Sequence, residues 1–423
     1  MDVLVLGAGV VGLCAAYALA RDGHRVSVLE RNPEAAREAS YANGGQLSYS
    51  YVAPLAGPGV VPNVPGWLLR ADSPLRFRPR PDVAQWRWGL SFLRACTAAQ
   101  SDETTRRLLR LSFLSRDLMR RLVAEEGVAF DLAPAGKLVA HSSEESFAAA
   151  RRLMAFQAEL GSVQEALDAS GCLALEPALR AIAPHLVGGI HTPGEEAADC
   201  RRFCLNLSDV LRARYGVRFV WATPVRQLVA QGGRLRAAMT PGGAMEADAF
   251  VLAAGAAAPA LTRPLGLRLP LYPLKGYSLS LPIADDAAAP RVSVTDAARK
   301  VVYARIGGVL RVAGMADLVG HDPRIDPARL DLLVREARAA FPAAARWDRL
   351  GPWAGLRPAT PTSAPILGPA PGLPNLMLDV GQGALGFTLA MASGRVVADL
   401  LAGRAPPVPM DGFDAASHGV RGG

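Results

Sequence analysis

The feature that most constrains the fold of this chain is the glycine pattern G-x-G-x-x-G at residues 7–12. The apolar run Val3–Leu6 precedes it and predicts a buried strand. The stretch Val10–Arg21 has helical spacing and ends just before an Asp-Gly pair, which predicts a helix closed by a glycine. This order of strand, glycine turn and helix is typical of an α/β sheet that binds a dinucleotide.

A second strand is predicted over Arg25–Leu29, and Glu30 stands at its end. In this pattern Gly7 permits a tight turn, Gly9 lets the backbone approach a pyrophosphate, and Gly12 lets the helix pack closely on the strand. Glu30 can accept hydrogen bonds from ribose hydroxyls, and its charge disfavours the 2′-phosphate of NADP. The motif in this context predicts a dinucleotide site.

Residues 3–20 carry no charge, which is also a property of signal and transmembrane segments. No basic region precedes them, and three glycines interrupt the run at fixed spacing. We therefore interpret this stretch as strand, turn and helix.

The composition of the 423 residues is that of a chain with a large core, and half of them are hydrophobic. Only three of the 46 basic residues are lysines, at positions 137, 275 and 300, and the formal net charge is +8. Eleven arginines lie in residues 76–121, where leucines at helical spacing predict a basic amphipathic helix preceded by Trp86 and Trp88. A solvated helix face is the favoured interpretation, and contact with an anionic membrane is the alternative. Nucleic acid is disfavoured, since no nucleic-acid motif accompanies the charge.

A second glycine turn near the C-terminus favours FAD over NAD. A strand is predicted over residues 375–380, a glycine-rich turn over 381–386, and a helix over 387–401. Backbone N–H groups at a helix start would stabilise the negative charge that a reduced flavin carries on its pyrimidine edge. A nicotinamide has no comparable requirement.

Three further segments resemble a known family. They are Ser40-Tyr-Ala-Asn-Gly-Gly-Gln46, Tyr272-Pro-Leu-Lys-Gly-Tyr-Ser278 and Gly355-Leu-Arg-Pro-Ala-Thr-Pro361. With the N-terminal fingerprint they resemble the D-amino-acid dehydrogenases, within the group of D-amino-acid oxidase, glycine oxidase and sarcosine oxidase. The resemblance implies noncovalent FAD and oxidative deamination of D-amino acids. Hydride would pass from Cα to flavin N5, and the imino acid would hydrolyse to a 2-oxo acid and ammonia.

The resemblance also implies a Rossmann-like α/β FAD-binding domain and an α+β substrate domain with a mainly antiparallel sheet. We expect the FAD-binding domain to comprise residues 1–85, 192–262 and 346–423. The substrate-binding domain would then comprise residues 86–191 and 263–345.

The residues that we expect to contact FAD lie in the two glycine turns, in the segment 40–46 and at the ends of predicted strands. They are Gly7, Gly9, Val10, Val11, Gly12, Glu30, Arg31, Ser40, Asn43, Gly44, Gly45, Gln46, Val225, Ala254, Gly255, Gly381, Gly383, Ala384, Leu385, Gly386, Phe387 and Thr388.

Arg357 is the candidate for binding the substrate carboxylate, because a guanidinium can clamp it with two parallel hydrogen bonds. Its place in Gly-Leu-Arg-Pro resembles the carboxylate-binding arginine of the wider group. Lys275 and Tyr277 should share one face of a strand that begins at Tyr272, and these three residues and Tyr303 are further pocket candidates. A solvated lysine and half-buried tyrosines are the alternative.

The chain departs from the family pattern at three places. Tyr49-Ser50 stands where family members commonly have Pro-Gly, Thr362-Ser363 where they have Asp-Gly, and Gln382 where they have His. D-amino acids are the leading substrate hypothesis, and because of these departures D-hydroxyproline or another secondary amine is the alternative. A flavin-binding electron-transfer subunit of a membrane complex is the third hypothesis.

The remaining expectations concern partners and location. Five cysteines without paired spacing predict reduced thiols, an intracellular location and no metal site. We expect a cytoplasmic enzyme with a small-molecule amino acid substrate and no nucleic acid. A peripheral position at the inner face of a bacterial membrane and quinone as electron acceptor are left open.

Overall fold

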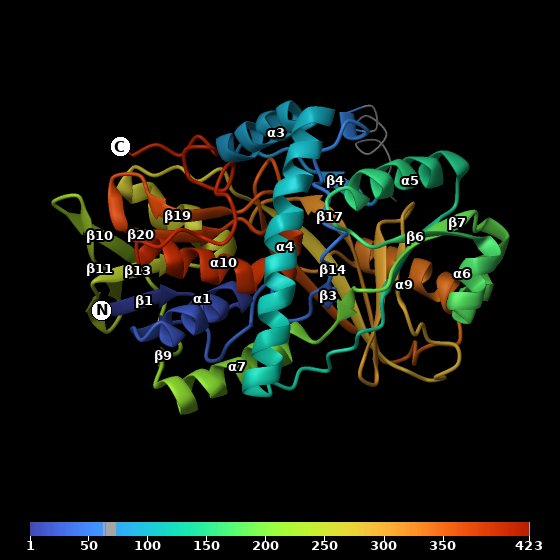
Figure 1. The fold of residues 1–423 in the computed structure, drawn as a ribbon, viewed down its shortest axis with the longest axis horizontal. Helices are drawn as coiled ribbons and strands as arrows, with labels where there is room; N and C mark the ends of the chain where they lie inside the picture. The colour runs from blue at the N-terminus through green and yellow to red at the C-terminus, as the bar shows by residue number, and fades with distance from the viewer. Residues whose placement is uncertain (62–63, 65–72, 423) are drawn as a thin grey trace.

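A computed structural model describes residues 1–61, 64 and 73–422. A mainly parallel sheet lies at one end of the molecule and a larger, mainly antiparallel sheet at the other (Figure 1). The long helix α4 (Ala98–Glu126) runs across the molecule between them.

The parallel sheet has the strand order β19-β20-β13-β1-β2-β9, and only β19 runs antiparallel to its neighbour. Its apolar strands are buried on both faces, as expected for a sheet covered on two sides. The sheet confirms the Rossmann-like prediction. The bounds are β1 Asp2–Leu6, β2 Arg25–Leu29, β9 Arg218–Val220, β13 Ala249–Leu252, β19 Ile366–Ala370 and β20 Leu373–Val380.

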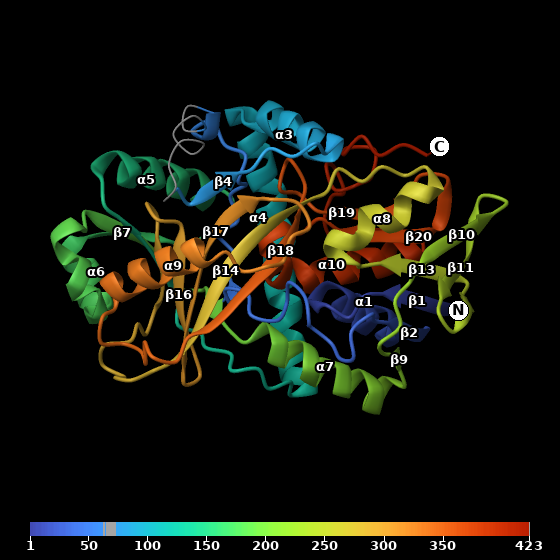
Figure 2. The ribbon, with the colours of Figure 1, turned by 180° about the vertical axis from the view of Figure 1, so that it is seen from behind.

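Helices cover one face of this sheet and a small antiparallel sheet covers the other (Figure 2). The helices are α1 (Val10–Arg21), α7 (Cys200–Tyr215) and α10 (Gly386–Leu401). The covering strands are β10 (Gln227–Gln231), β11 (Arg234–Thr240) and β12 (Gly243–Glu246), next to the short helix α8 (Ala258–Thr262).

The helical segment Gly383–Leu401, which contains α10, is long and apolar enough to cross a membrane, alone among the described residues. Two-thirds of its apolar window is buried inside the protein. α10 packs on α1 so closely that a Cβ at Gly394 would lie 2.6 Å from the nitrogen of Ala15. Both observations are those of a core helix.

The large sheet has the order β18-β14-β17-β16-β15-β5-β7-β6, and β4 pairs with β17 at its side. Its pairs are antiparallel except β15–β5 and β17–β4. This confirms the predicted α+β part with a mainly antiparallel sheet. The bounds are β4 Leu75–Phe77, β5 Lys137–His141, β6 Glu165–Asp168, β7 Gly188–Thr192, β14 Tyr272–Pro282, β15 Ser293–Asp296, β16 Val301–Ile306, β17 Val309–Leu318 and β18 Gly351–Ala359.

The two faces of the large sheet have different neighbours. One face packs on α9 (Pro327–Ala340) in an apolar cluster that includes Leu332 and Leu333. The other face contacts the segment 42–46, as when Ser278 donates to the carbonyl oxygen of Ala42 at 2.6 Å. The helices α5 (Glu144–Ala158) and α6 (Ala169–Leu175) lie near the β6–β7 edge (Figure 1).

Strand pairing and packing place three segments differently from the expected domain boundaries. β18, expected with the FAD-binding segment 346–423, pairs with β14 of the large sheet, and β4, expected within 1–85, pairs with β17. α4, expected with 86–191, buries Leu108 and Leu122 in the core beneath β1. Contacts between distant parts of the chain, which local patterns do not report, cause each difference.

Most of the arginine-rich region lies in α3 (Val83–Ala95) and α4, and its first residues lie in β4 and the loop that follows it. Asp82 caps α3 by accepting a hydrogen bond from the nitrogen of Ala84. In α4, Leu111 is fully buried and Leu118 packs against the same core, so its leucine face points inward. The apolar stripe of the predicted amphipathic helix is therefore a core face rather than a free surface.

Candidate active site

The first glycine turn joins β1 to α1 and leaves no room for a side chain at Gly7 or Gly12. Gly7 has a φ of +112°, and a Cβ there would lie 2.7 Å from the carbonyl oxygen of Ala253. A Cβ at Gly12 would lie 2.0 Å from the carbonyl oxygen of Gly7, so α1 packs directly on the turn. Gly9 is the N-cap of α1 and provides no side-chain cap. The helix start therefore offers N–H groups to a phosphate.

Ser40 lies beside the start of α1, as the sequence predicts for a pyrophosphate contact. Its Oγ accepts a hydrogen bond from the nitrogen of Val10 at 3.1 Å. The Ser40 side chain is buried, and the Val10–Val11 peptide follows the same turn. The structure thus brings these predicted contacts together.

Glu30 is buried at the end of β2, beside the same turn. Its Oε2 accepts a hydrogen bond from the nitrogen of Ala8 at 2.8 Å, and its Oε1 accepts one from the nitrogen of Asn32 at 2.9 Å. The carboxylate lies where a ribose would extend from a pyrophosphate at α1. Arg31, next in the chain, is about half-exposed and pairs with Glu38 on the surface at 2.6 Å.

Three other predicted contacts border this region. The Cα of Ala254 lies 3.4 Å from the Cβ position at Gly7, and Gly255 follows with a φ of +53°. Val225 lies in the loop after β9, half-buried against the core on the β10–β12 side. The nitrogen of Thr223 donates to the carbonyl oxygen of Glu30 at 2.8 Å and fixes this loop to β2.

The segment 42–45 has its carbonyl groups held by other parts of the chain. Arg311 donates to the carbonyl oxygen of Asn43 at 2.6 Å, and Ala198 donates to that of Gly45 at 2.8 Å. The nitrogen of Gly45 donates to Oδ1 of Asn43 at 3.0 Å. Within the described residues the N–H groups of Asn43 and Gly44 have no acceptor. Two free donors in a half-buried turn fit the polar edge of a flavin ring.

The second glycine turn meets this segment at the start of α10. Gly381 and Gly383 have φ values of +88° and +57°, and a 3₁₀ turn over Gly383–Leu385 leads into the helix. Thr388 Oγ1 accepts a hydrogen bond from the nitrogen of Ser48 at 3.2 Å, next to Gln46 in the chain. The residues Ala384, Leu385 and Gly386 start α10 without a side-chain cap. Phe387 is buried and packs on Phe130 and Phe203, so its side chain is part of the core.

Asp379 is a buried acid at this turn that the sequence reasoning missed. It follows Leu378, which pairs with β13 at the carboxyl edge of the parallel sheet. Its Oδ1 accepts a hydrogen bond from Gln382 at 2.6 Å, whereas its buried Oδ2 has no partner among the described residues. Burial raises the pKa of Asp379 well above its usual value. An unpartnered oxygen beside the glycine turns fits a hydroxyl-rich chain such as the ribityl group of FAD.

Arg357 lies on β18, directly opposite Leu274 of β14. One guanidinium nitrogen donates to the carbonyl oxygen of Met315 at 2.8 Å, and Met315 has a φ of +65° at the irregularity in β17. Gly276 provides the room, because a Cβ there would lie 2.3 Å from the guanidinium. Burial lowers the pKa of Arg357, which nearby Asp317 partly offsets.

Arg357 also lies close to the second glycine turn along the chain. Its strand ends at Ala359, which forms a bridge with Gln382. Alternation on β14 places Leu274, Gly276 and Ser278 on one face, the face that contacts Ala42. The structure thus places the predicted carboxylate ligand on the sheet face that meets the predicted FAD turns.

Three of the other pocket candidates lie on the opposite face, toward α9. Lys275 donates to the carbonyl oxygen of Arg324 at 2.9 Å, and Tyr277 donates to Asp317 at 3.1 Å. The ring of Tyr303 packs against Phe341, with 4.9 Å between ring centroids. Lys275 and Tyr277 do share a face, but the structure does not bring them or Tyr303 to Arg357.

Tyr272, the fourth candidate, begins β14 at the end that α3 covers. Its hydroxyl lies 3.2 Å from Oδ2 of Asp82, and its ring packs near Trp88. Desolvation raises the pKa of Tyr272 to about 12, so the phenol stays protonated at neutral pH. These contacts are those of a residue that anchors α3.

Sequence reasoning also missed Lys137, which lies 1% exposed on β5 with its ammonium on Gln46 and Ser48. Its only signal in the sequence was the scarcity of lysine. The buried acid Glu195, whose Oε1 accepts a hydrogen bond from the nitrogen of Ser50 at 2.6 Å, gave no signal.

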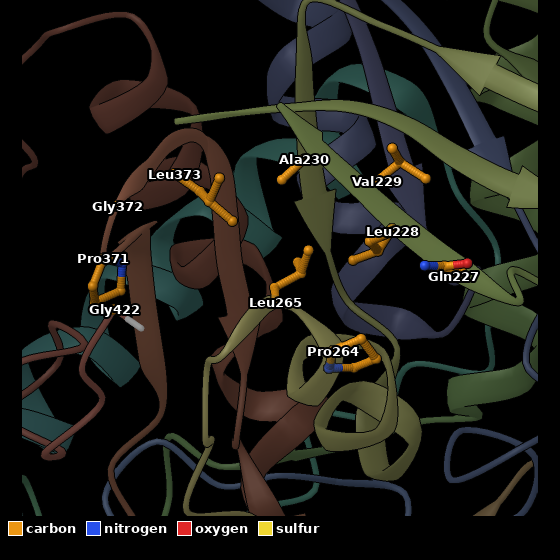
Figure 3. Close-up of a pocket in the computed structure, with 10 residues that line it drawn as sticks. All are labelled: Gln227, Leu228, Val229, Ala230, Pro264, Leu265, Pro371, Gly372, Leu373 and Gly422. Carbon is orange, nitrogen blue, oxygen red and sulfur yellow. The ribbon is translucent and has the colours of Figure 1, made fainter. Parts of the chain in front are cut away.

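A surface pocket of about 390 Å³ lies elsewhere, between β10, the turn Arg263–Leu265 and the hairpin before β20 (Figure 3). Its lining includes Gln227, Leu265 and Leu373 and contains no ionisable side chain. The predicted site residues are not among those that line it. The pocket offers no group for acid–base or redox chemistry.

Curated relatives match the chain along almost its whole length. The D-amino acid dehydrogenase 2 of Ralstonia nicotianae is 52% identical over 417 residues, 96% of this chain and 98% of that protein. A protein of the same name from Pseudomonas aeruginosa is 50% identical and covers 97% of each chain. The D-amino acid dehydrogenase of Paramagnetospirillum magneticum is 44% identical and covers 98% of each chain.

Solved structures share the fold. Glycine oxidase from Geobacillus kaustophilus superposes with a TM-score of 0.77 at 22% identity, over 98% of this chain and 97% of that one. L-proline dehydrogenase from P. horikoshii gives a TM-score of 0.74 at 17% identity, over 99% of this chain and 98% of that one.

The family described as FAD dependent oxidoreductase matches residues 2–400. This match confirms the predicted cofactor and class of enzyme, while the individual contacts stay predictions. With nearly its whole length matched, the chain belongs to the family of FAD-dependent oxidoreductases.

Proposed function

We propose that this protein is a D-amino acid dehydrogenase, which removes two electrons from the Cα–N bond of its substrate. The buried guanidinium of Arg357, on the sheet face that meets the predicted FAD turns, is the observation that carries the proposal. Curated relatives up to 52% identical bear this name and match 96–98% of the chain, which supports the substrate class.

In this proposal the residues of the chain bind and orient. Arg357 binds the substrate carboxylate with the N–H groups that Met315 leaves free, so Cα is held at a fixed distance from the segment 42–45. Free N–H groups in that segment and at the start of α10 hold FAD, with Ser40 and Glu30 at its pyrophosphate and ribose. Bound FAD supplies the hydride acceptor.

The loop that follows Tyr49-Ser50 contacts Thr362-Ser363, the other departure from the family pattern on the expected substrate side. The nitrogen of Leu55, in the loop after Tyr49-Ser50, donates to Oγ of Ser363 at 3.1 Å. Different loops at one edge of the site would change which side chain or ring the pocket accepts. The names of the curated relatives favour D-amino acids, and a secondary amine is the alternative that a substrate test must exclude.

Anaerobic titration of the purified, FAD-loaded protein tests these alternatives. We expect D-alanine to bleach the flavin absorbance near 450 nm and L-alanine to leave it unchanged. Bleaching by D-proline or D-hydroxyproline alone would favour the secondary-amine enzyme. Failure of all these substrates would contradict the proposed function and favour an electron-transfer subunit.

We further propose that α3 rests on an anionic bilayer at the inner face of a bacterial membrane, where quinone would accept the electrons. Val83, Trp86 and Leu90 lie 64%, 53% and 51% exposed along this helix. Arg87 and Arg94 are exposed on the same helix. Exposed Trp and Leu beside arginines complement the interface of an anionic membrane.

A further inference from the structure

Lys137 is an almost completely buried cation at the contact between the large sheet and the FAD turns. It is the first residue of β5, and its side chain extends toward the segment 46–51. Its Nζ donates to Oε1 of Gln46 and, at 3.3 Å, to Oγ of Ser48. The tyrosine ring of Tyr51 lies on another side, 4.7 Å from Nζ.

The acceptors of this ammonium are neutral. Within the described residues Lys137 forms no ion pair, and its two hydrogen-bond acceptors are an amide and a hydroxyl. The nearby Glu195 acts on it only through space, and burial raises the pKa of that carboxyl. Burial lowers the pKa of Lys137 to about 8, which leaves it mostly charged at neutral pH. Burying a charge without an ion pair costs free energy, and a function at this position would explain why the lysine is there.

The contacts of Lys137 fix the orientation of Gln46. The Nε2 of Gln46 donates to Oγ of Ser293 at 2.6 Å, while its Oε1 faces Lys137. Ser293 and Lys137 are direct neighbours on the paired strands β15 and β5. Two adjacent strands of the large sheet therefore hold both ends of one amide.

The same contacts reach both predicted flavin-binding turns. Gln46 follows Gly45 directly, at the end of the turn with free N–H groups. The nitrogen of Ser48, the other partner, donates to Thr388 Oγ1 at the start of α10. Lys137 thus lies behind the meeting point of the two turns.

We propose that Lys137 is a positioning residue for FAD, which orients Gln46 and holds a positive charge without a direct ion pair beside the two predicted flavin-binding turns. The charge stabilises bound FAD, and the reduced cofactor more than the oxidised one because reduction adds negative charge. This inference rests on the proposed placement of FAD against residues 43–46.

Three variants separate the hydrogen bond from the charge. Lys137→Met removes both. Lys137→Gln keeps a donor for Gln46 and removes the charge. Lys300→Met is the matched control, since Lys300 is a lysine in the turn between β15 and β16 of the same sheet but has no contact with Gln46. FAD affinity of the apoprotein and the midpoint potential of bound FAD are measured without substrate, with circular dichroism to check folding.

For Lys137→Met we expect FAD to bind about tenfold more weakly, as for loss of a hydrogen bond to a charged group. For both Lys137 variants we expect a more negative midpoint potential. A tenfold loss of affinity for reduced relative to oxidised FAD corresponds to about 30 mV for two electrons. Lys137→Gln should recover part of the affinity without recovering the potential, and Lys300→Met should change neither.

An unchanged affinity and potential in a folded Lys137→Met protein would overturn the proposal. If that variant does not fold, an unchanged potential in Lys137→Gln would do so. Both readouts are independent of amino acid oxidation. An enzyme with a different substrate would therefore still show the effect of Lys137.

Discussion

Arg357, the proposed ligand of the substrate carboxylate, can take its position only because there is a small space beside its guanidinium. Gly276 provides that space, and Met315 provides the carbonyl that orients the guanidinium. For Arg357→Ala we expect retention of FAD and a KM for D-amino acids raised by about a hundredfold, from loss of a charge-assisted pair. Steady-state kinetics and the flavin spectrum measure both. An unchanged KM would remove Arg357 from the substrate site.

Gly276→Ala tests the same geometry from the other side. Its Cβ would lie 2.3 Å from the guanidinium, so Arg357 must move while its charge is retained. We expect a KM raised by at least about tenfold with FAD content unchanged. Gly308→Ala is a suitable control, since a Cβ there meets nothing within 4 Å. Equal kinetics for the two variants would contradict the role of the Arg357 position.

Lys137 also predicts a pH dependence of stability. Burial lowers its pKa to about 8, against about 10.5 in an unfolded chain. Between these values the unfolded state binds more protons, so the unfolding free energy rises with pH. Relative to Lys137→Met, the wild-type apoprotein should gain up to about 3 kcal/mol from pH 8 to 10.5. Urea unfolding of both proteins across this range measures the difference, and a constant difference would contradict it.

How well the position of a residue could be predicted from the sequence depended on what determines that position. Gly7 and Gly12 could be predicted because the backbone at a tight turn excludes a Cβ. The shared face of Lys275 and Tyr277 could also be predicted from strand alternation. The neighbours of that face could not be predicted, because they depend on the packing of α9, which is a long-range contact. The sequence alone therefore could not show that Lys275 and Tyr277 lie away from Arg357.

Helices with a local signal were predicted to within a residue or two. The predicted bounds of α1, Val10–Arg21, match the structure, since glycine and apolar spacing determine both ends. The amphipathic pattern of α4 was recognised, but its environment was not, because an apolar stripe is compatible with a core or with a membrane. In the structure the stripe is buried in the core.

The exposed apolar side chains of α3 give a prediction at the level of one element. Trp86→Ser with Leu90→Ser should weaken binding to vesicles that contain anionic lipid by about tenfold, since two exposed apolar groups would no longer enter the interface. Cosedimentation at low and high salt measures it, and salt should weaken wild-type binding. Val163→Ser, which changes an apolar side chain that is 77% exposed in the loop before β6, is the control. Equal sedimentation of all three proteins would exclude α3 as the contact.

At the scale of the whole molecule, the sequence predicted the two fold classes but not all boundaries. β18 and β4 belong to the large sheet through pairing with β14 and β17, and neither pairing leaves a local pattern. The segments of the proposed FAD site are held together by contacts between residues hundreds of positions apart, such as Ser48 with Thr388. Only the resemblance to a family could have grouped them in advance.

FAD should stabilise the protein as a whole, since its proposed contacts come from several segments. At a concentration of one hundred times its Kd, a ligand specific for the folded state adds about 2.7 kcal/mol. Thermal unfolding of the apoprotein with added FAD should therefore shift upward by several degrees. FMN, which lacks the adenylate, should shift it less. Equal shifts for both would contradict the proposed contacts of Glu30 and Ser40.

The hydrogen bonds on the segment 42–45 set an order of events during synthesis. Ala42 is held by Ser278 and Asn43 by Arg311, residues that leave the ribosome more than two hundred positions later. The N-terminal glycine turn is likewise completed only after β13 has been made, because β13 pairs with β1. With FAD in its proposed place, a nascent chain has no finished cofactor site until most of it has been made, so FAD would load at the end of synthesis or afterwards.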